Sequence, residues 1–241
     1  MNKTIHLDTL EGIPGKYLKK LQRYREAFKS NLYLDGLLDE EQDIRDTVME
    51  IDGYCMDHYI KGYHYTRAIV DDIRTQGLLC RSGEEIRARF TANHGTLFTE
   101  QEWGTIQKCW KQYFDTQQQS SRDQRIFFNA TTTALDNGGA EPLFDHFGGE
   151  QIHMPLNGHD GIMRKLSQIG MAVTVVFRFR GTQATGIGKL NPWGHTAVST
   201  YHRMINPEAY IHDVDAYVSE AVTPDRIIEI RLMQGIGPAS V

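Results

Sequence analysis

The chain has 241 residues, enough for one large domain or for a domain with a helical extension, and enough to bury a hydrophobic core. Hydrophobic residues make up 40% and charged residues 24%, which is typical of a globular protein and excludes a fibrous or disordered chain. No apolar run approaches the roughly 20 residues of a transmembrane helix, and the first residues lack the features of a secretory signal. We therefore expect a cytoplasmic protein that makes no contact with a membrane.

The charge and the cysteine content exclude further classes of protein. Lysine and arginine number 26 against 31 acidic residues, and the net charge of −5 disfavours broad electrostatic capture of duplex nucleic acid. The three cysteines lie far apart without a C-x-x-C pair, so the sequence predicts reduced thiols and neither a disulfide framework nor a cysteine zinc site.

The first sixty residues predict helices. Apolar residues recur at three- and four-residue spacing along one stripe, and the opposite face is basic. The stripe consists of Leu18, Leu21, Tyr24, Phe28 and Leu32. The next segment, from Asp35 to Asp57, holds nine acidic residues and one arginine, and it predicts a helix that begins near Asp39. Opposite charges could pair these two helices and leave no basic patch on the surface.

The middle of the chain predicts a strand and then more helices. Residues 62–67 (GYHYTR) are aromatic and favour a strand, and residues 69–77 predict a helix that ends at a glycine. Residues 83–118 again indicate helix, with Thr99 and Glu102 placed for a capping box. The polar segment 117–124 (QQQSSRDQ) predicts an exposed loop.

Strand signals dominate the last part of the sequence. Residues 125–132 predict a strand, and a short helix is expected around Pro142, between two glycine pairs. Residues 171–181 predict a strand with one buried half and one half-exposed half. Two more strands are expected in 215–222 and 226–232, around a Thr-Pro turn. The whole pattern predicts an α+β fold with helices first and mostly strands later.

Several histidines lie close together near the end of the chain, with Asp213 and Asp215 beside them. His195, His202 and His212 could belong to a metal-dependent hydrolase, but their spacing fits no compact ligand pattern. The sequence therefore predicts no metal site, and the hydrolase remains a minor alternative.

Three segments in order carry the most specific signal. The first is the strand with His64-Tyr65-Thr66-Arg67, followed by a helix that ends in Gly-Leu. The second is the strand with Phe127 and Phe128, and the third is Glu220, followed by a Thr-Pro turn and a last strand. This order resembles the ADP-ribosyltransferase superfamily, in its branch with His, an aromatic residue and Glu.

The resemblance covers roughly residues 60–232. It implies an N-terminal helical extension, residues 1–59, and an ADP-ribosyltransferase-like domain, residues 60–241, built on a split antiparallel or mixed β-sheet. The implied activity is transfer of ADP-ribose from NAD, as a toxin or effector, to a macromolecular acceptor. Arginine-modifying members carry an acid two residues before the catalytic glutamate, where this chain has Val218. Arginine is therefore not expected, and protein, nucleic-acid and small-molecule acceptors all stay open.

By this resemblance, Glu220 is the catalytic acid. Cleavage of the nicotinamide glycosidic bond develops positive charge on the ribose, so a fixed carboxylate beside that sugar stabilises the transition state more than the ground state. Glu220 would also accept a hydrogen bond from the ribose 2′-hydroxyl. Glu229 in the last strand is the competing acid; Glu220 is preferred because it precedes the Thr-Pro turn.

The same resemblance assigns NAD contacts to the first strand. His64 would hydrogen-bond the adenosine-side ribose, the backbone of Tyr65 would hold the nicotinamide amide, and Thr66 could add a hydroxyl contact. Taken alone, His64 would more often be a satisfied core histidine.

Two further assignments each leave an alternative open. Arg67 could grip the pyrophosphate, or it could form a surface ion pair with Asp71, four residues further along. Phe127 or Phe128 would stack on the nicotinamide ring, and strand alternation allows only one of them to face the cleft.

The rival interpretation comes from another class of protein. In it the chain is a non-catalytic interaction module, whose basic and acidic N-terminal helices bind a partner while the later strands serve as a scaffold. Binding of NAD would distinguish the two.

Overall fold

The computed structural model describes residues 4–114 and 116–233. The helices are α1 (Gly15–Gln22), α2 (Arg25–Ser30), α3 (Leu34–Glu40), α4 (Gln42–Met56), α5 (Val70–Gln76), α6 (Gly83–His94), α7 (Glu100–Tyr113), α8 (Thr116–Arg122), α9 (Thr133–Asp136), α10 (Glu141–Asp145), α11 (Gly149–Ile152), α12 (Asp160–Ser167) and α13 (Pro192–Ile205). Short 3₁₀ turns are η1 (Gly95–Leu97), η2 (Met154–Leu156), η3 (Gly181–Gln183) and η4 (Pro224–Arg226). The strands are β1 (Tyr59–Ala68), β2 (Ile126–Asn129), β3 (Met171–Arg180), β4 (Ala184–Gly186), β5 (Asp215–Val218) and β6 (Ile227–Leu232).

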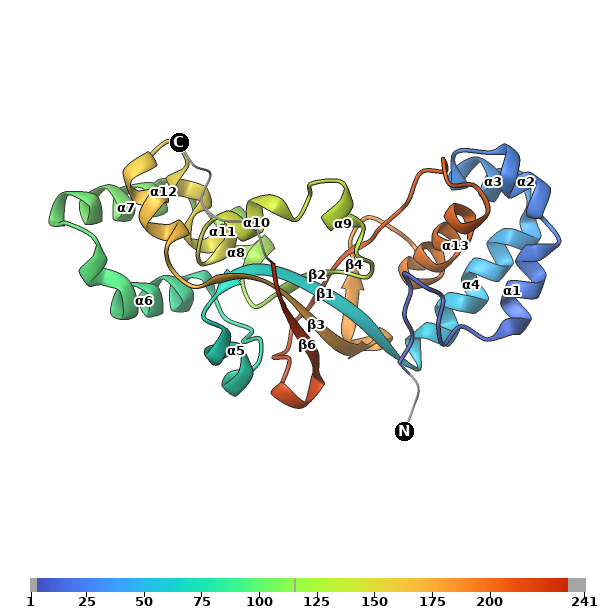
Figure 1. Cartoon of the computed structure of the whole chain (residues 1–241), viewed down its shortest axis with the longest axis horizontal. Helices are drawn as coiled ribbons and strands as arrows, with labels where there is room; N and C mark the ends of the chain where they lie inside the picture. The colour runs from blue at the N-terminus through green and yellow to red at the C-terminus, as the bar shows by residue number, and fades with distance from the viewer. Residues whose placement is uncertain (1–3, 115, 234–241) are drawn as a thin grey trace. The chain divides into compact units, whose positions relative to one another are not determined.

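The strands form one six-stranded sheet in the order β4-β5-β2-β1-β3-β6 (Figure 1). Strands β1 and β2 pair antiparallel, with Tyr63 opposite Asn129, and β4 and β5 pair antiparallel, with Ala184 opposite Val218. The predicted α+β class is confirmed. None of the helices in the described part of the chain combines the length and the apolar character needed to cross a bilayer.

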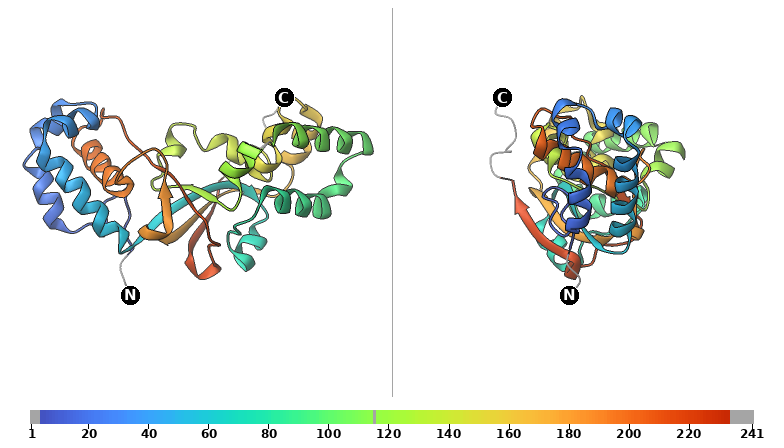
Figure 2. Two further views of the ribbon diagram at one scale, coloured as in Figure 1. Left: turned by 180° about the vertical axis from the view of Figure 1, so that it is seen from behind. Right: turned by 90° about the vertical axis from the view of Figure 1, so that its right-hand side faces the viewer.

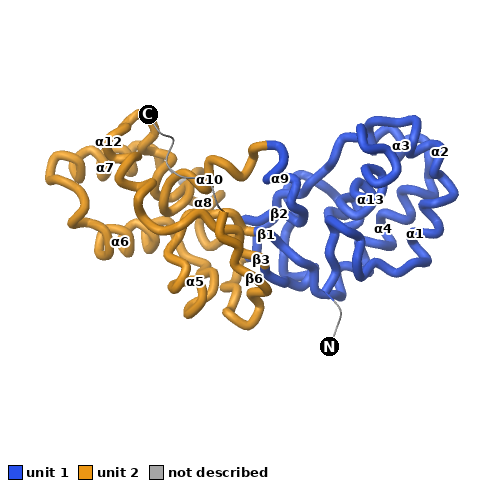
Figure 3. Tube along the Cα trace, in the orientation of Figure 1, with its two compact units in different colours: residues 1–63, 127–137, 177–218 blue, residues 64–126, 138–176, 219–241 orange. Residues whose placement is uncertain are grey.

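The chain divides into two compact units, coloured separately in Figure 3. Unit 1 comprises residues 1–63, 127–137 and 177–218, and unit 2 comprises residues 64–126, 138–176 and 219–241. Each unit combines segments that are far apart in the sequence. The expected domain boundary between residues 59 and 60 falls at the beginning of β1.

In unit 1 the helix α13 lies beside α4, as two views agree (Figures 1 and 2). Gly194 permits this close approach, because a Cβ there would lie 2.0 Å from the carbonyl oxygen of Val48. The carboxylate of Asp52 on α4 accepts hydrogen bonds from the N–H groups of Trp193 and Gly194, at 2.9 and 3.1 Å. Asp52 therefore caps α13 from a neighbouring helix, where the preceding residue Asn191 supplies no side-chain cap.

The N-terminal helices of unit 1 confirm one expectation and correct another. Lys20 on α1 forms an ion pair with Glu50 on α4, with Nζ and Oε2 2.7 Å apart, so the basic and acidic segments do pair. The single amphipathic helix predicted for residues 18–32 is wrong. It is interrupted between α1 and α2, and Leu32 lies beyond both helices with 48% of its surface exposed.

Unit 2 has its own hydrophobic core, formed mainly by α6, α7, α12 and the short turns between them. Its buried members are Phe90, Phe98, Ile106, Trp110, Phe114, Ile152, Leu156, Ile162, Leu166 and Ile169. The indole N–H of Trp110 donates to the carbonyl of Ile152 at 3.0 Å, which satisfies its polar edge inside the cluster. The predicted capping box at Thr99 and Glu102 is confirmed at the beginning of α7.

Two sequence expectations about later elements are wrong. The segment predicted as a loop over residues 117–124 lies largely in α8, whose Arg122 pairs with Glu150 at 2.8 Å. The expectation of mostly strands after the first helices misses α12 and α13. The expected strands β1, β2, β3, β5 and β6 are confirmed, and β3 is buried from Ala172 to Phe177, as the sequence predicted.

Candidate functional site

Strand β1 presents the four predicted NAD-contact residues on two different faces. His64 and Thr66 are half-buried, and Tyr65 and Arg67 are buried, as the alternation of a strand requires. His64 and Thr66 therefore lie on the more exposed face of this part of the strand, and Tyr65 and Arg67 lie on the face that is buried in unit 2.

The buried pair anchors the strand. The ring of Tyr65 contacts Phe144 edge to face, with centroids 5.8 Å apart. The guanidinium of Arg67 donates to the carbonyl oxygens of Ile169 and Phe144, each at 3.1 Å. The alternative of a surface ion pair between Arg67 and Asp71 is wrong, because Arg67 is buried and Asp71 pairs with Arg74.

Helix α5 follows β1 and ends at Gly77, as predicted. Gly77 has a φ of +76° and a ψ of −160°, a region that is essentially restricted to glycine. The next residue, Leu78, forms an isolated antiparallel bridge with Val222, in which each N–H donates to the other's carbonyl at 2.9 Å. The Gly-Leu end of the helix is thereby joined to the segment that follows Glu220.

Glu220 lies just beyond β5, which ends at Val218, and it is exposed. Its carboxylate forms an ion pair with Arg226, with Oε1 and Nη1 2.6 Å apart. Burial raises the pKa of the Cys80 thiol, and the negative charge of Glu220, which lies near the segment just after the Leu78 bridge, raises it further. Two of the three family-like segments therefore meet within unit 2.

Gly77 makes this junction testable. A Cβ at position 77 would lie 2.0 Å from the carbonyl oxygen of Val222, so we expect Gly77→Ala to break the bridge and to speed hydrogen exchange at the amides of Leu78 and Val222. Gly138→Ala is the matched control, since Gly138 has a similar φ of +80° but its Cβ would meet only the Glu141 side chain, at 3.9 Å. Unchanged exchange at both amides in Gly77→Ala would contradict the junction.

The two candidate phenylalanines belong to unit 1 and differ in burial. Phe128 is buried against Phe177 and Phe179, with ring centroids 5.2 and 4.6 Å away, and Gly62 leaves room for its ring. Phe127 is half-buried, and its ring contacts Tyr217 on β5 at 5.7 Å. Phe128 is thus a core residue, and Phe127 is the aromatic ring that a ligand could reach.

A polar group that no single sequence motif predicts lies at the ends of β2 and β5. The side-chain amide of Asn129 donates to the carboxylate of Asp215 at 2.7 Å. Burial raises the pKa of Asp213 to about 7. Raised carboxyl pKa values are typical of catalytic acids, but neither Asp213 oxygen has accessible surface. A substrate therefore does not reach this carboxyl, and we assign it to the interior of unit 1.

Two of the three histidines of the hydrolase alternative do come together. The Nε2 atoms of His195 and His212 lie 3.4 and 3.8 Å from the carboxylate of Asp35. His202 lies elsewhere, with its Nε2 at 3.0 Å from the carbonyl of Phe28. Lys189 also contacts Asp35, at 3.5 Å, and an ammonium group there opposes a metal ion.

Among the described residues, no group of three or more His, Cys, Asp or Glu side chains could hold a metal ion. The hydrolase alternative therefore finds no support in this part of the chain. Comparison with known proteins gives no further guide, because no protein-family model, no curated protein and no solved structure matches the chain.

Proposed function

We propose that the protein is an NAD-consuming ADP-ribosyltransferase, with Glu220 as its catalytic acid and His64 and Thr66 among the residues that bind NAD. The observation that carries the proposal is the bridge between Leu78 and Val222. It joins the helix that follows the His64 strand to the segment that carries Glu220, within one compact unit.

The chemistry required of Glu220 is electrostatic. The bond between nicotinamide and ribose C1′ breaks, its electron pair leaves with nicotinamide, and an acceptor nucleophile then bonds to C1′ and loses its proton. A carboxylate held beside the ribose stabilises the positive charge that develops in this step. Glu220 is exposed, and its carboxylate forms an ion pair with Arg226 at 2.6 Å.

The burial of the other candidates limits the NAD contacts. We retain His64 and Thr66, which are half-buried, and the backbone of Tyr65. Of the two phenylalanines Phe127 is the more exposed, but it belongs to unit 1, so we leave both out of the contacts proposed within unit 2. We leave Arg67 out, because its side chain is 8% exposed and two of its donors are held by backbone carbonyls.

The test compares two glutamates with matched surroundings. Glu220 and Glu229 are both exposed, and each pairs with a nearby arginine, Arg226 at 2.6 Å and Arg231 at 2.8 Å. With NAD and a cell lysate as the source of acceptor, we expect Glu220→Gln to lower nicotinamide release at least about a hundredfold. Glu229→Gln should leave the rate almost unchanged, because an exposed ion pair contributes little.

The outcomes separate the competing interpretations. If only Glu229→Gln lost activity, Glu229 on β6 would be the catalytic acid instead of Glu220. Equal activity in both variants and the wild type would reject either glutamate as the catalytic acid. No nicotinamide release by the wild type, together with no calorimetric heat at millimolar NAD, would reject the enzyme and favour the interaction module. Transfer of label from NAD to protein, to nucleic acid or to a small molecule would identify the acceptor.

A further inference from the structure

We propose that His159 serves as the base for the Cys109 thiol, and that the pocket beside them is a site where a small electrophile modifies this thiol. Cys109 lies on α7 and His159 directly precedes α12, and the Sγ and Nε2 atoms are 3.4 Å apart. Both residues belong to unit 2. The site is separate from the proposed transferase function, because neither His64 nor Glu220 takes part in it.

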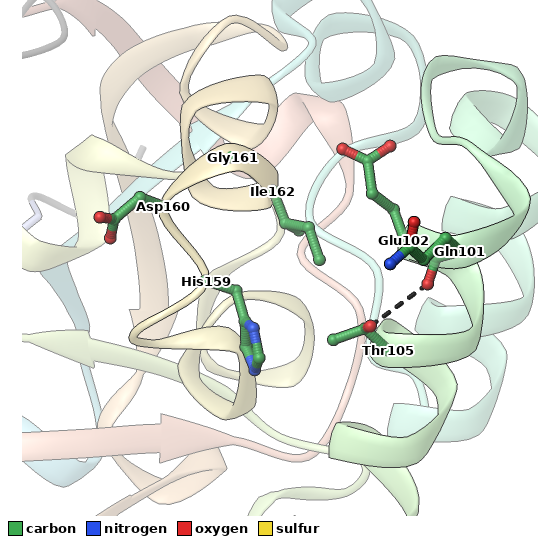
Figure 4. Close-up of a pocket in the computed structure, with 7 residues that line it drawn as sticks. All are labelled: Gln101, Glu102, Thr105, His159, Asp160, Gly161 and Ile162. Atoms are coloured by element: carbon green, nitrogen blue, oxygen red, sulfur yellow. Dashed lines mark hydrogen bonds between the residues drawn. The ribbon is translucent and has the colours of Figure 1, made fainter.

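A pocket of about 230 Å³ opens next to the pair. Figure 4 shows its lining, with Gln101, Glu102 and Thr105 on one helix and residues 159–162 at the beginning of the other. Thr105 lines the pocket and lies one helical turn before Cys109. The two side chains are therefore on the same side of α7, and Cys109 lies next to the pocket lining. His159 belongs both to the pair and to the lining. A small molecule in the pocket would therefore lie next to the base that activates the thiol.

His159 is the group placed to take the proton of Cys109. Cys109 lies near the carboxyl end of α7, where the helix dipole disfavours an anion, so the helix does not supply the stabilisation. An imidazole within hydrogen-bonding reach of a thiol can take its proton and then stabilise the thiolate as a cation.

Other charges around the pair do not cancel this effect. Glu102 forms an ion pair with Lys165 on α12 at 2.6 Å, so its charge is balanced within the pocket wall. Asp160 is adjacent to His159 in the sequence and lines the same pocket. On α7, Lys108 and Lys111 lie close to Cys109 in sequence, and the turn η2, which packs against α7, carries no charged residue.

The three cysteines provide an internal comparison. Burial raises the pKa of Cys55, and the negative charge of Asp52 raises it further. Burial and the charge of Glu220 raise the pKa of Cys80. Cys109 is half-buried and is the cysteine with an imidazole partner. An electrophile should therefore discriminate strongly between the three thiols.

Alkylation by iodoacetamide tests the pair. In this reaction the Cys109 thiolate attacks the methylene carbon, the carbon–iodine bond breaks, iodide leaves, and the thiol proton remains on His159 until solvent removes it. The rate at each cysteine is measured by peptide mass spectrometry on the full-length protein. An ordinary thiol is less than a few per cent ionised at pH 6, so we expect Cys109 to react at least about tenfold faster than Cys80 there, after allowance for the lower nucleophilicity of a less basic thiolate.

Substitution of the base should remove this advantage. In His159→Gln we expect the Cys109 rate at pH 6 to fall about tenfold, and to rise with pH as an unassisted thiol does. His94→Gln is the control, because His94 contacts the rings of Phe90 and Phe147 in the same unit. Equal Cys109 rates in His159→Gln and the wild type, or a wild-type rate no faster than that of Cys80, would overturn the proposal.

A second measurement does not depend on the folding of the His159 variant. The imidazole of His159 is titrated by NMR in the wild type and in Cys109→Ser. A neighbouring thiolate stabilises the imidazolium, so the imidazole should lose its proton at lower pH in the serine variant than in the wild type. Identical titration curves in the two proteins would also overturn the proposal.

Discussion

Gly194→Ala should destabilise the protein by about 3 kcal/mol or more, because it forces α13 away from α4. The new Cβ would lie 2.0 Å from the carbonyl oxygen of Val48 and 2.9 Å from the amide nitrogen of Asp52. Both are backbone atoms, so no side-chain rotation relieves the overlap. Separation of the helices would also weaken the two hydrogen bonds by which Asp52 caps α13, a loss of about 1 kcal/mol for a capping contact.

Urea unfolding measures this loss against a matched glycine on the facing helix. Gly53 lies in the interior of α4 and is exposed, and a Cβ at this position would have no neighbouring atom within 4 Å. Gly53→Ala should therefore stabilise the protein by about 0.5–1 kcal/mol, since alanine favours the helix. If both substitutions gave the same change in unfolding free energy, the close approach of α4 and α13 would be contradicted.

The helix α13 also shows why sequence patterns found some elements and not others. Its residues from Trp193 to Thr200 are all buried, including the polar His195, Thr196, Ser199 and Thr200, so burial there does not follow the polar and apolar pattern of the sequence. In β1 and β3, by contrast, the β-branched and aromatic residues that favour a strand are the ones the sheet buries. The sequence therefore predicted these strands correctly.

Tertiary contacts explain the other features that the sequence did not predict. Helix α8 is rich in glutamine and serine, and its Arg122 contacts Glu150, which lies 28 residues further along the chain. Pairing of His195 and His212 depends on Asp35, a residue on a helix more than 150 positions earlier. No spacing rule applied to a single sequence connects residues at such distances.

The candidate site divides in the same way. The order of a strand, a helix and Gly-Leu could be predicted from the sequence. It depends on local residues, and Gly77 has the conformation that only glycine readily adopts. The sequence could not predict which of Phe127 and Phe128 is the exposed ring, because this depends on which face of β2 packs against Phe177 and Phe179. The burial of Arg67 was hidden for the same reason, since its carbonyl partners come from two distant segments.

Asp213→Asn should change how stability depends on pH. The folded-state pKa of Asp213 is about 7, against about 3.9 for an unfolded aspartate. Between these values the folded protein holds a proton that the unfolded chain has lost, so the contribution of Asp213 to stability falls as the pH rises from about 4 to about 7. Above pH 7 the buried carboxylate is charged in the folded state, and the full loss is about 4 kcal/mol.

Two buried histidines change the pH dependence of folding stability in the opposite direction. The pKa values of His153 and His195 are each lowered to about 4, mainly by burial. Their contribution to stability is present above pH 6.5 and is lost as the pH falls towards 4, because the unfolded chain then binds protons that the folded protein does not. In the wild type these effects partly cancel that of Asp213 over the same pH range.

Asparagine keeps the shape of Asp213 but cannot ionise, so it isolates the aspartate. We expect the unfolding free energy of Asp213→Asn to exceed that of the wild type by an amount that grows by about 4 kcal/mol between pH 4 and pH 8. Urea unfolding at several pH values measures this difference. Asp136→Asn is the control, because Asp136 is an exposed aspartate of the same unit. Parallel stability curves for Asp213→Asn and the wild type would show that the Asp213 carboxyl stays ionised in the folded protein, and that its burial is incomplete.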